Sequence, residues 1–253
     1  MPIVQEAMNK LIHALSQYPR LSTTLAALLL GGIAVFGFAP FSYTFNTFAS
    51  LYGLCLLWLH APTRGRAAWL GFVYGLALFL GGAHWVYIAM HETGGMPPLL
   101  AGLCTLALAT LLALFPMLAG VIQHQVKIHK AMRAIVLIPI AWSVGELLRG
   151  SVFTGLPWLS MGMGEHFLQG LAPLVGATGI SFLLMLLAGV AASFSLPMRR
   201  AKIRSFAALN IIFMVAISTS LSIKAQWVKP IGKPLSVSVV QANINQAIKW
   251  EPE

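Results

Sequence analysis

The sequence predicts an all-α polytopic membrane protein of about seven transmembrane helices, followed by the start of a soluble domain. Hydrophobic residues make up 58% of the 253 positions and charged residues only 9%, with a mean hydropathy of +0.82. Soluble domains carry about 25% charged residues, so this composition excludes an ordinary soluble protein. Apolar runs of spanning length recur along the chain, and the pattern changes to strand-like alternation only after Pro234.

Residues 1–20 are expected to form an N-terminal segment that lies in the membrane interface. Within residues 3–15, apolar residues recur at helical spacing and polar residues occupy the opposite side. A solvated N-terminal helix fits the same pattern. A cleaved signal peptide does not, because the long apolar run begins only at Leu21 and has no small-residue cleavage site.

The transmembrane domain is predicted to cover residues 21–233. About 20 apolar residues are needed to cross the hydrocarbon core, and each span must be a helix because backbone groups cannot stay unpaired in lipid. The seven predicted spans are 21–38, 43–60, 67–90, 99–122, 134–148, 171–196 and 206–223. In the third span, Gly71 and Gly75 form a small-residue face that favours close packing with a neighbouring helix.

The net charge of +10 reports topology rather than a nucleic-acid partner. The predicted outer loops hold only Arg149, and Lys224, Lys229, Lys233 and Lys249 follow in the C-terminal part. The predicted inner segments hold Lys10, Arg20, Arg64, Arg66, Lys127, Lys130, Arg133, Arg199, Arg200, Lys202 and Arg204. By the positive-inside rule, the N-terminus is expected in the cytoplasm and the C-terminus on the outer side.

Glu146 and Arg149 are the main candidates for a functional site. They stand three residues apart on one helical face and can pair, and an ionisable residue near membrane depth is a functional candidate. A structural ion pair at the interface is the alternative. Trp158, in the following outer loop, and Trp85, at the outer end of the third span, are either site residues or members of the interfacial aromatic belt.

The chain has few of the residue types that usually form catalytic or metal-binding sites. The six acidic residues are all glutamates and are spread along the sequence, so neither a catalytic carboxylate pair nor a metal site is predicted. Cys55 and Cys104 fall within apolar runs, where cysteine behaves as a small hydrophobe. No catalytic residue, metal or cofactor is therefore assigned.

Residues 234–253 are predicted to begin a domain on the outer side. Leu235 to Gln241 alternate like a strand, and a polar turn and an apparent helix start follow. About 20 residues cannot form a stable domain alone, because a single strand leaves both of its edges unpaired. The strand is therefore expected to need further chain, or another protein, for completion.

Five stretches, taken in order, resemble the apolipoprotein N-acyltransferases of Gram-negative inner membranes. They are FGFAPF from Phe36, HWVYIAMHETGGMPP from His84, WSVGELLRGSVFTGLPWLSMG from Trp142, PLVGATGISFLL from Pro173 and VSVVQANINQAIKW from Val237. Leu156 and Met163 depart from the family, which usually has phenylalanine and tyrosine there.

The resemblance implies a helical membrane domain that carries a periplasmic α/β nitrilase-like domain. Members of the family transfer an acyl chain from a phospholipid, through a cysteine thioester, to the amino group of the diacylglyceryl-cysteine of an apolipoprotein. A glutamate, a lysine and a cysteine perform this chemistry, and the resemblance places all three beyond Glu253. It also implies that Arg149, Trp158 and Trp250 lie near the lipid entrance or the active site.

Two hypotheses follow for the function. In the first, the chain is the membrane domain of such an acyltransferase, a truncated form that is inactive by itself. In the second, it is a non-enzymatic membrane scaffold that binds lipid or lipoprotein and recruits a separate catalytic chain. A transporter is disfavoured, because no internal repeat and no mid-span charges are apparent in the sequence.

Overall fold

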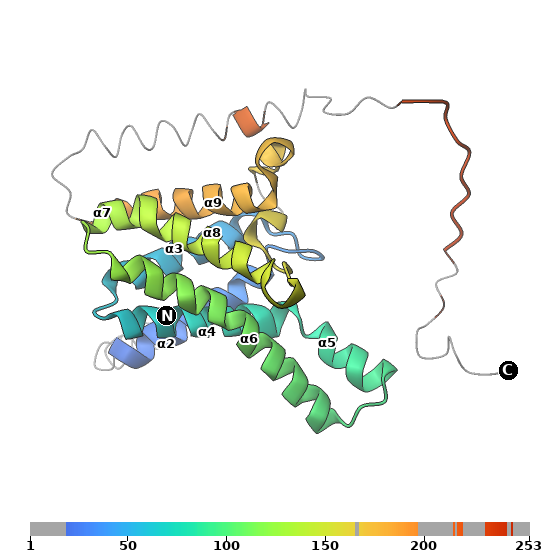
Figure 1. Cartoon of the computed structure of the whole chain (residues 1–253), viewed down its shortest axis with the longest axis horizontal. Coiled ribbons are helices and arrows are strands. Elements are labelled where there is room, and N and C mark those ends of the chain that lie inside the picture. The colour runs from blue at the N-terminus through green and yellow to red at the C-terminus, as the bar shows by residue number, and fades with distance from the viewer. Residues whose placement is uncertain are drawn as a thin grey trace, which may run out of the picture.

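The computed structural model describes residues 19–164, 167–196, 215, 217–219, 231–241 and 244. This part of the chain is a bundle of helices, and no strand is formed in it (Figure 1). The predicted interfacial segment and most of the seventh predicted span, 206–223, lie outside the described residues. The all-helical expectation for the membrane domain is confirmed for the described part.

Two 17-residue helices begin the described bundle, α2 (Pro19–Val35) and α3 (Thr44–His60). Helix α4 (Arg64–Gly82) follows and ends before the predicted end of its span at residue 90, because the helix is interrupted at Ala83. The short α5 (Trp85–Ile88) and a π-helical turn, Ala89–Thr93, come next. The 28-residue α6 (Pro98–Gln125) is the longest helix described.

The second half of the described bundle is built on α8 and α9. The short α7 (Lys130–Met132) and a π-helical turn, Arg133–Leu137, continue into α8 (Ile138–Arg149). After the loop that contains the 3₁₀ turns Val152–Thr154 and Met161–Met163, a third turn, Gln169–Leu171, leads into α9 (Ala172–Ser193). Helix α9 is kinked at Gly176, whose φ is 66°.

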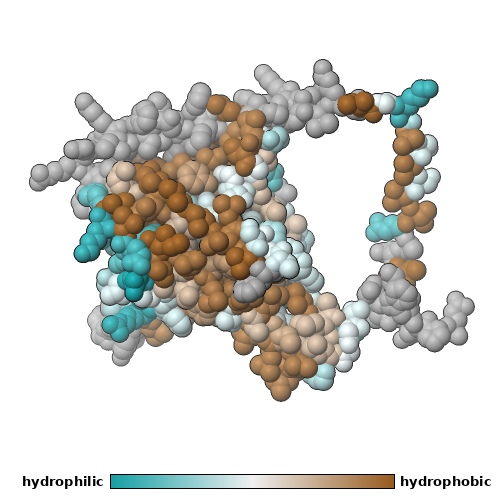
Figure 2. All heavy atoms as spheres, viewed as in Figure 1, coloured by the Kyte–Doolittle hydropathy of each residue, from teal (hydrophilic) through white to brown (hydrophobic). Residues whose placement is uncertain are grey.

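Within the residues that the structure describes, four helical segments are long and apolar enough to cross a membrane: Arg64–Gly82, Pro98–Gln125, Lys130–Arg149 and Gln169–Ser193. They correspond to the third to sixth predicted spans. Helices α2 and α3 coincide with the first two predicted spans, but at 17 residues they lie at the lower limit for crossing about 30 Å of hydrocarbon. Figure 2 shows the broad hydrophobic surface of the helices, with hydrophilic residues gathered at the end where α7 lies.

Close packing of α4 on α6 forms the centre of the bundle. A β-carbon at Gly71 would overlap the carbonyl group of Pro116, and one at Gly120 would overlap the carbonyl group of Ala67. The absence of side chains at these glycines lets the two backbones approach, as small residues do in membrane helix pairs. The prediction that Gly71 and Gly75 form a packing face is thus confirmed. The start of α6 and the neighbouring α5 project beyond the other helices (Figure 1).

The strand predicted at 235–241 is not formed. Residues 231–241 have neither helix nor strand, and Leu235, Val237 and Val239 are more than three-quarters exposed. A strand requires a hydrogen-bonding neighbour, and the described part of the chain offers none at this place. The start of a nitrilase-like domain therefore stays a prediction.

Candidate functional site

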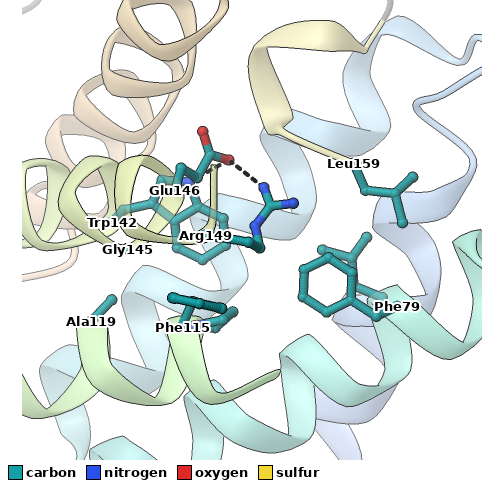
Figure 3. Close-up of a pocket in the computed structure, with 10 residues that line it drawn as sticks. Phe79, Phe115, Ala119, Trp142, Gly145, Glu146, Arg149 and Leu159 are labelled. Carbon is teal, nitrogen blue, oxygen red and sulfur yellow. Dashed lines mark hydrogen bonds and ion pairs between the residues drawn. The ribbon is translucent and has the colours of Figure 1, made fainter. Parts of the chain in front are cut away.

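The candidate site is built at the C-terminal end of α8 and in the loop 150–164 that follows. Glu146 and Arg149 are only 7% and 3% exposed, and Glu146 Oε1 lies 4.0 Å from Arg149 Nη2 (Figure 3). The predicted pairing is confirmed, but the two side chains are buried within the protein rather than exposed at the membrane–water interface. Removing two charges from solvent is costly, so the pair needs further hydrogen bonds to be stable.

Arg149 obtains these bonds from the loop. Its Nη1 donates to the carbonyl oxygen of Leu156 at 3.1 Å and to that of Trp158, and its Nη2 donates to Ser160 Oγ at 3.0 Å. The guanidinium also lies 5.2 Å from the centre of the Phe79 ring, within range of a cation–π interaction. One guanidinium therefore holds the loop against the end of α8.

Glu146, one helical turn before Arg149 in α8, also binds the loop. Its Oε1 accepts from the indole N–H of Trp142 at 3.2 Å and from the backbone N–H of Met161 at 2.9 Å. Trp142 stands four residues before Glu146, so both side chains lie on one face of α8. The carboxylate thus holds the far end of the loop that Arg149 holds in the middle.

The loop backbone makes a tight return at Gly155. Its φ is 80°, and a β-carbon here would overlap the carbonyl group of Gly150. The N–H of Leu156 then donates to the carbonyl oxygen of Arg149 at 2.9 Å. Only glycine fits this position without strain, and the turn brings the carbonyl groups of Leu156 and Trp158 within reach of the guanidinium.

Two exposed tryptophans lie together beside this loop. The rings of Trp85, from α5, and Trp158 have centroids 4.7 Å apart, and the two residues are 44% and 41% exposed. The rings are tilted by 51° to each other, and together they form an exposed apolar surface of a kind that suits a lipid chain or an amphipathic group. The sequence predicted both residues, and the structure brings them together.

A small pocket lies beneath the loop, between α4, α6 and α8 (Figure 3). Its volume is about 10 Å³, which is about the room for one water molecule. Its lining includes Phe79, Phe115, Trp142, Glu146, Arg149 and Leu159. The interior of the site is therefore closely packed, and its exposed apolar part is the Trp85–Trp158 pair.

The described residues offer no evident nucleophile or metal centre. Cys55 is buried and its thiol lies 3.4 Å from Met185 Sδ, while Cys104 is exposed on α6. No group of three or more potential metal ligands is found in the part of the chain that was described. The arrangement can position a substrate, but it presents no acid–base pair next to a nucleophile.

Four of the five predicted site residues come together: Glu146, Arg149, Trp158 and Trp85. Trp250 lies outside the described residues. Sequence reasoning missed Trp142, Ser160 and Phe79. The helical spacing of Trp142 from Glu146 could have identified it, whereas Ser160 and Phe79 reach Arg149 only through the loop and through helix packing.

Comparison with known proteins identifies the family that the chain matches. Residues 30–190 match the family described as "Apolipoprotein N-acyltransferase N-terminal domain". The chain is 37% identical over 232 residues to the apolipoprotein N-acyltransferase of Nitrosomonas europaea, covering 90% of this chain and 46% of that protein. It is 38% identical over 229 residues to that of Methylococcus capsulatus, covering 89% of this chain and 45% of that protein.

A third relative, the apolipoprotein N-acyltransferase of Pasteurella multocida, is 32% identical over 250 residues, which cover 96% of this chain and 47% of that protein. The chain thus spans less than half the length of these relatives. The matched family region includes α3 to α8 and the loop that carries the candidate site. The chain belongs to the family of apolipoprotein N-acyltransferase N-terminal domains.

Proposed function

We propose that this chain is the membrane domain of a phospholipid:apolipoprotein N-acyltransferase and that its Trp85–Trp158 surface receives a lipid substrate. The observation that carries the proposal is the family match over residues 30–190, which includes all the helices and the loop that position this surface. The acyl donor is a membrane phospholipid, and the acceptor is the diacylated N-terminus of an apolipoprotein. Arg149 and Glu146 act by positioning the loop.

The proposed location is the bacterial inner membrane, with seven spans, the N-terminus in the cytoplasm and the C-terminus in the periplasm. The distribution of positive charge supports this orientation. Arg64 and Arg66 begin α4, and Lys127 and Lys130 follow the end of α6, whereas the loop 150–164 at the other end of α8 contains no lysine or arginine. The site would then face the periplasm, on the side where Trp250 and residues 234–253 are also proposed to lie.

We propose that the nucleophile comes from a periplasmic nitrilase-like domain rather than from this membrane domain. Cys55 is fully buried, and Cys104 lies on the apolar α6, so neither thiol is placed beside a base. By this proposal the helices bind and orient substrate, and this chain alone does not catalyse the transfer.

Substrate binding is the direct test. The full chain in lipid nanodiscs would be titrated with a fluorescent diacylated lipopeptide, and the Kd measured by anisotropy. W158A and W85A should each weaken binding about fivefold to tenfold, because each removes part of the aromatic surface. W158F should retain most of the affinity, and L147A, which removes an exposed apolar side chain elsewhere on α8, should leave it unchanged. Equal affinity in W158A and in the unsubstituted chain would contradict the proposal.

A second candidate function is a scaffold that recruits a separate catalytic chain. The exposed apolar alternation of Leu235, Val237 and Val239 favours it, because such a segment can add to the edge of another sheet. The nitrilase-like domain of a relative, expressed separately, would be mixed with this chain, and N-acylation of the lipopeptide measured. Activity that requires both proteins and is lost in V237K/V239K supports the scaffold, whereas activity of this chain alone contradicts both functions.

A further inference from the structure

A second, much larger cavity lies at the other, basic end of the bundle. It has a volume of about 1000 Å³, is open to the surroundings on one side, and is lined by the starts of α2 and α4, the end of α3 and Ser195. It shares no lining residue with the pocket beneath the loop 150–164. The side chains that matter for its chemistry are Arg20, Arg66, His60, Trp69, Leu56 and Leu57.

Two arginines, Arg20 and Arg66, line this cavity, and the Arg66 side chain reaches the backbone of Arg20. Arg66 Nη2 donates to Thr23 Oγ1, to Thr24 Oγ1 at 2.8 Å and to the carbonyl oxygen of Arg20, and these bonds fix its position between α2 and α4. Arg20 is exposed at the start of α2. Among the described residues, the hydrogen bonds of the Arg66 side chain all come from Nη2, and a guanidinium has five N–H groups in all.

No carboxylate of the described residues compensates these two charges. The described glutamates are Glu92 and Glu146, neither of which lines the cavity, and Glu146 is paired with Arg149. Two neighbouring cations repel each other, and an anion between them relieves the repulsion and accepts charge-assisted hydrogen bonds. The charge of the cavity therefore favours a phosphate or a similar anion.

The remaining walls favour a lipid over a free anion. Leu56, Leu57 and Leu70 provide an apolar side, and the indole of Trp69 is 47% exposed, with its N–H 3.3 Å from Thr24 Oγ1. A tryptophan beside cationic groups is typical of the level at which headgroups meet acyl chains. Basic pockets between membrane helices on the positively charged side bind anionic headgroups.

We propose that this cavity binds an anionic phospholipid, with its phosphate between Arg20 and Arg66 and the start of its acyl chains against Leu56 and Leu57. The site is separate from the Trp85–Trp158 surface and does not depend on the proposed acyl transfer. A bound lipid would join the starts of α2 and α4 through its phosphate.

Lipid selectivity tests this proposal. The full chain in a neutral detergent would be titrated with short-chain phosphatidylglycerol, with phosphatidylcholine of the same chain length and with inorganic phosphate, and bound lipid counted by native mass spectrometry. Phosphatidylglycerol should bind at least about fivefold more tightly than phosphatidylcholine. R20Q should remove about fivefold of that affinity, which corresponds to about 1 kcal/mol per basic residue at a membrane surface, and R20K should retain it.

Two further variants separate a built site from general surface attraction. R64Q removes an exposed positive charge next to the cavity that does not line it, and it should change the affinity less than twofold. G65L should weaken binding by placing a bulky side chain in the lining of the cavity, because Gly65 lines it and a β-carbon there meets nothing within 4 Å. Equal losses in R20Q and R64Q, normal binding to G65L, or equally tight binding of inorganic phosphate would each overturn the proposal.

Discussion

Arg149 contributes more to this molecule through the loop than through its ion pair. It donates to the carbonyl oxygens of Leu156 and Trp158 and to Ser160 Oγ, while its separation from Glu146 Oε1 is 4.0 Å. The planar guanidinium suits this task because its donors point in several fixed directions, whereas a lysine ammonium is a point charge on a flexible stem. The residue therefore connects the end of α8 to the surface that presents Trp158.

Replacing Arg149 should therefore destabilise the protein strongly. R149M leaves Glu146 as a buried charge without its cation and the loop acceptors without a donor, and we expect a loss of about 3–5 kcal/mol in unfolding free energy. R149K should recover less than half of it. Thermal unfolding followed by tryptophan fluorescence in detergent measures both.

The double variant E146Q/R149M provides the control for this prediction. Its loss should be smaller than the sum of the two single losses, because removing both charges leaves neither one unpaired. Additive losses would contradict a coupled pair.

The pairing of Glu146 with Arg149 could be predicted from their spacing, but the bonds to the loop could not. Three residues on a helix bring two side chains together whatever follows. The contacts of Arg149 with Ser160 and Phe79 depend on the positive φ of Gly155 and on the packing of α4, which the local sequence does not encode in its periodicity. Trp85 and Trp158 could each be assigned to the outer end, yet their ring contact depends on where α5 begins.

Among the helices, the pair α4 and α6 shows how small residues set the distance between elements. Gly120 faces the backbone of Ala67, whereas Gly102, on the same helix, faces open space. Membrane helices gain no hydrophobic energy from leaving lipid, so close van der Waals contact must supply their association.

These two glycines give a matched test. G120A should destabilise the protein by about 1–3 kcal/mol, because its methyl group enters a filled interface and the helices must separate. G102A should be neutral or slightly stabilising, since alanine favours a helix and meets no neighbour there. The melting temperatures of G120A and G102A would be measured in the same detergent. Equal melting temperatures would contradict the close packing of α4 on α6 at Gly120.

The existence of the helices could be predicted better than their ends. Hydropathy located α2, α3, α4, α6, α8 and α9, because apolar composition over about 20 residues is a strong signal. It did not predict the break at Ala83 or the π-helical turns at Ala89–Thr93 and Arg133–Leu137, because hydropathy averaged over a window does not distinguish a regular α-helix from an interrupted or π-helical one. It also could not supply a partner for the strand expected at 235–241.

For the molecule as a whole, the proposed orientation places two chemically different ends on opposite sides of the membrane. Single cysteines would be introduced in a C104A background at Arg64, on the basic end, and at Glu92, in the turn between α4 and α6. A membrane-impermeant maleimide applied to spheroplasts should label E92C at least about tenfold more than R64C, and lysis should remove the difference. Stronger labelling of R64C than of E92C in spheroplasts would contradict the proposed orientation.

In the proposed function, the bonds of Arg149 also limit how a substrate could reach the Trp85–Trp158 surface. Swinging the loop 150–164 away would strip the guanidinium of three oxygen partners, at a cost on the order of 5 kcal/mol when each charged hydrogen bond contributes about 1.5–3 kcal/mol. An opened loop would then be present in fewer than about one molecule in a thousand. The loop is thus a fixed wall rather than a lid, and in the proposed function a lipid would approach Trp158 sideways from the bilayer, at a rate set by lateral diffusion and not by a conformational gate.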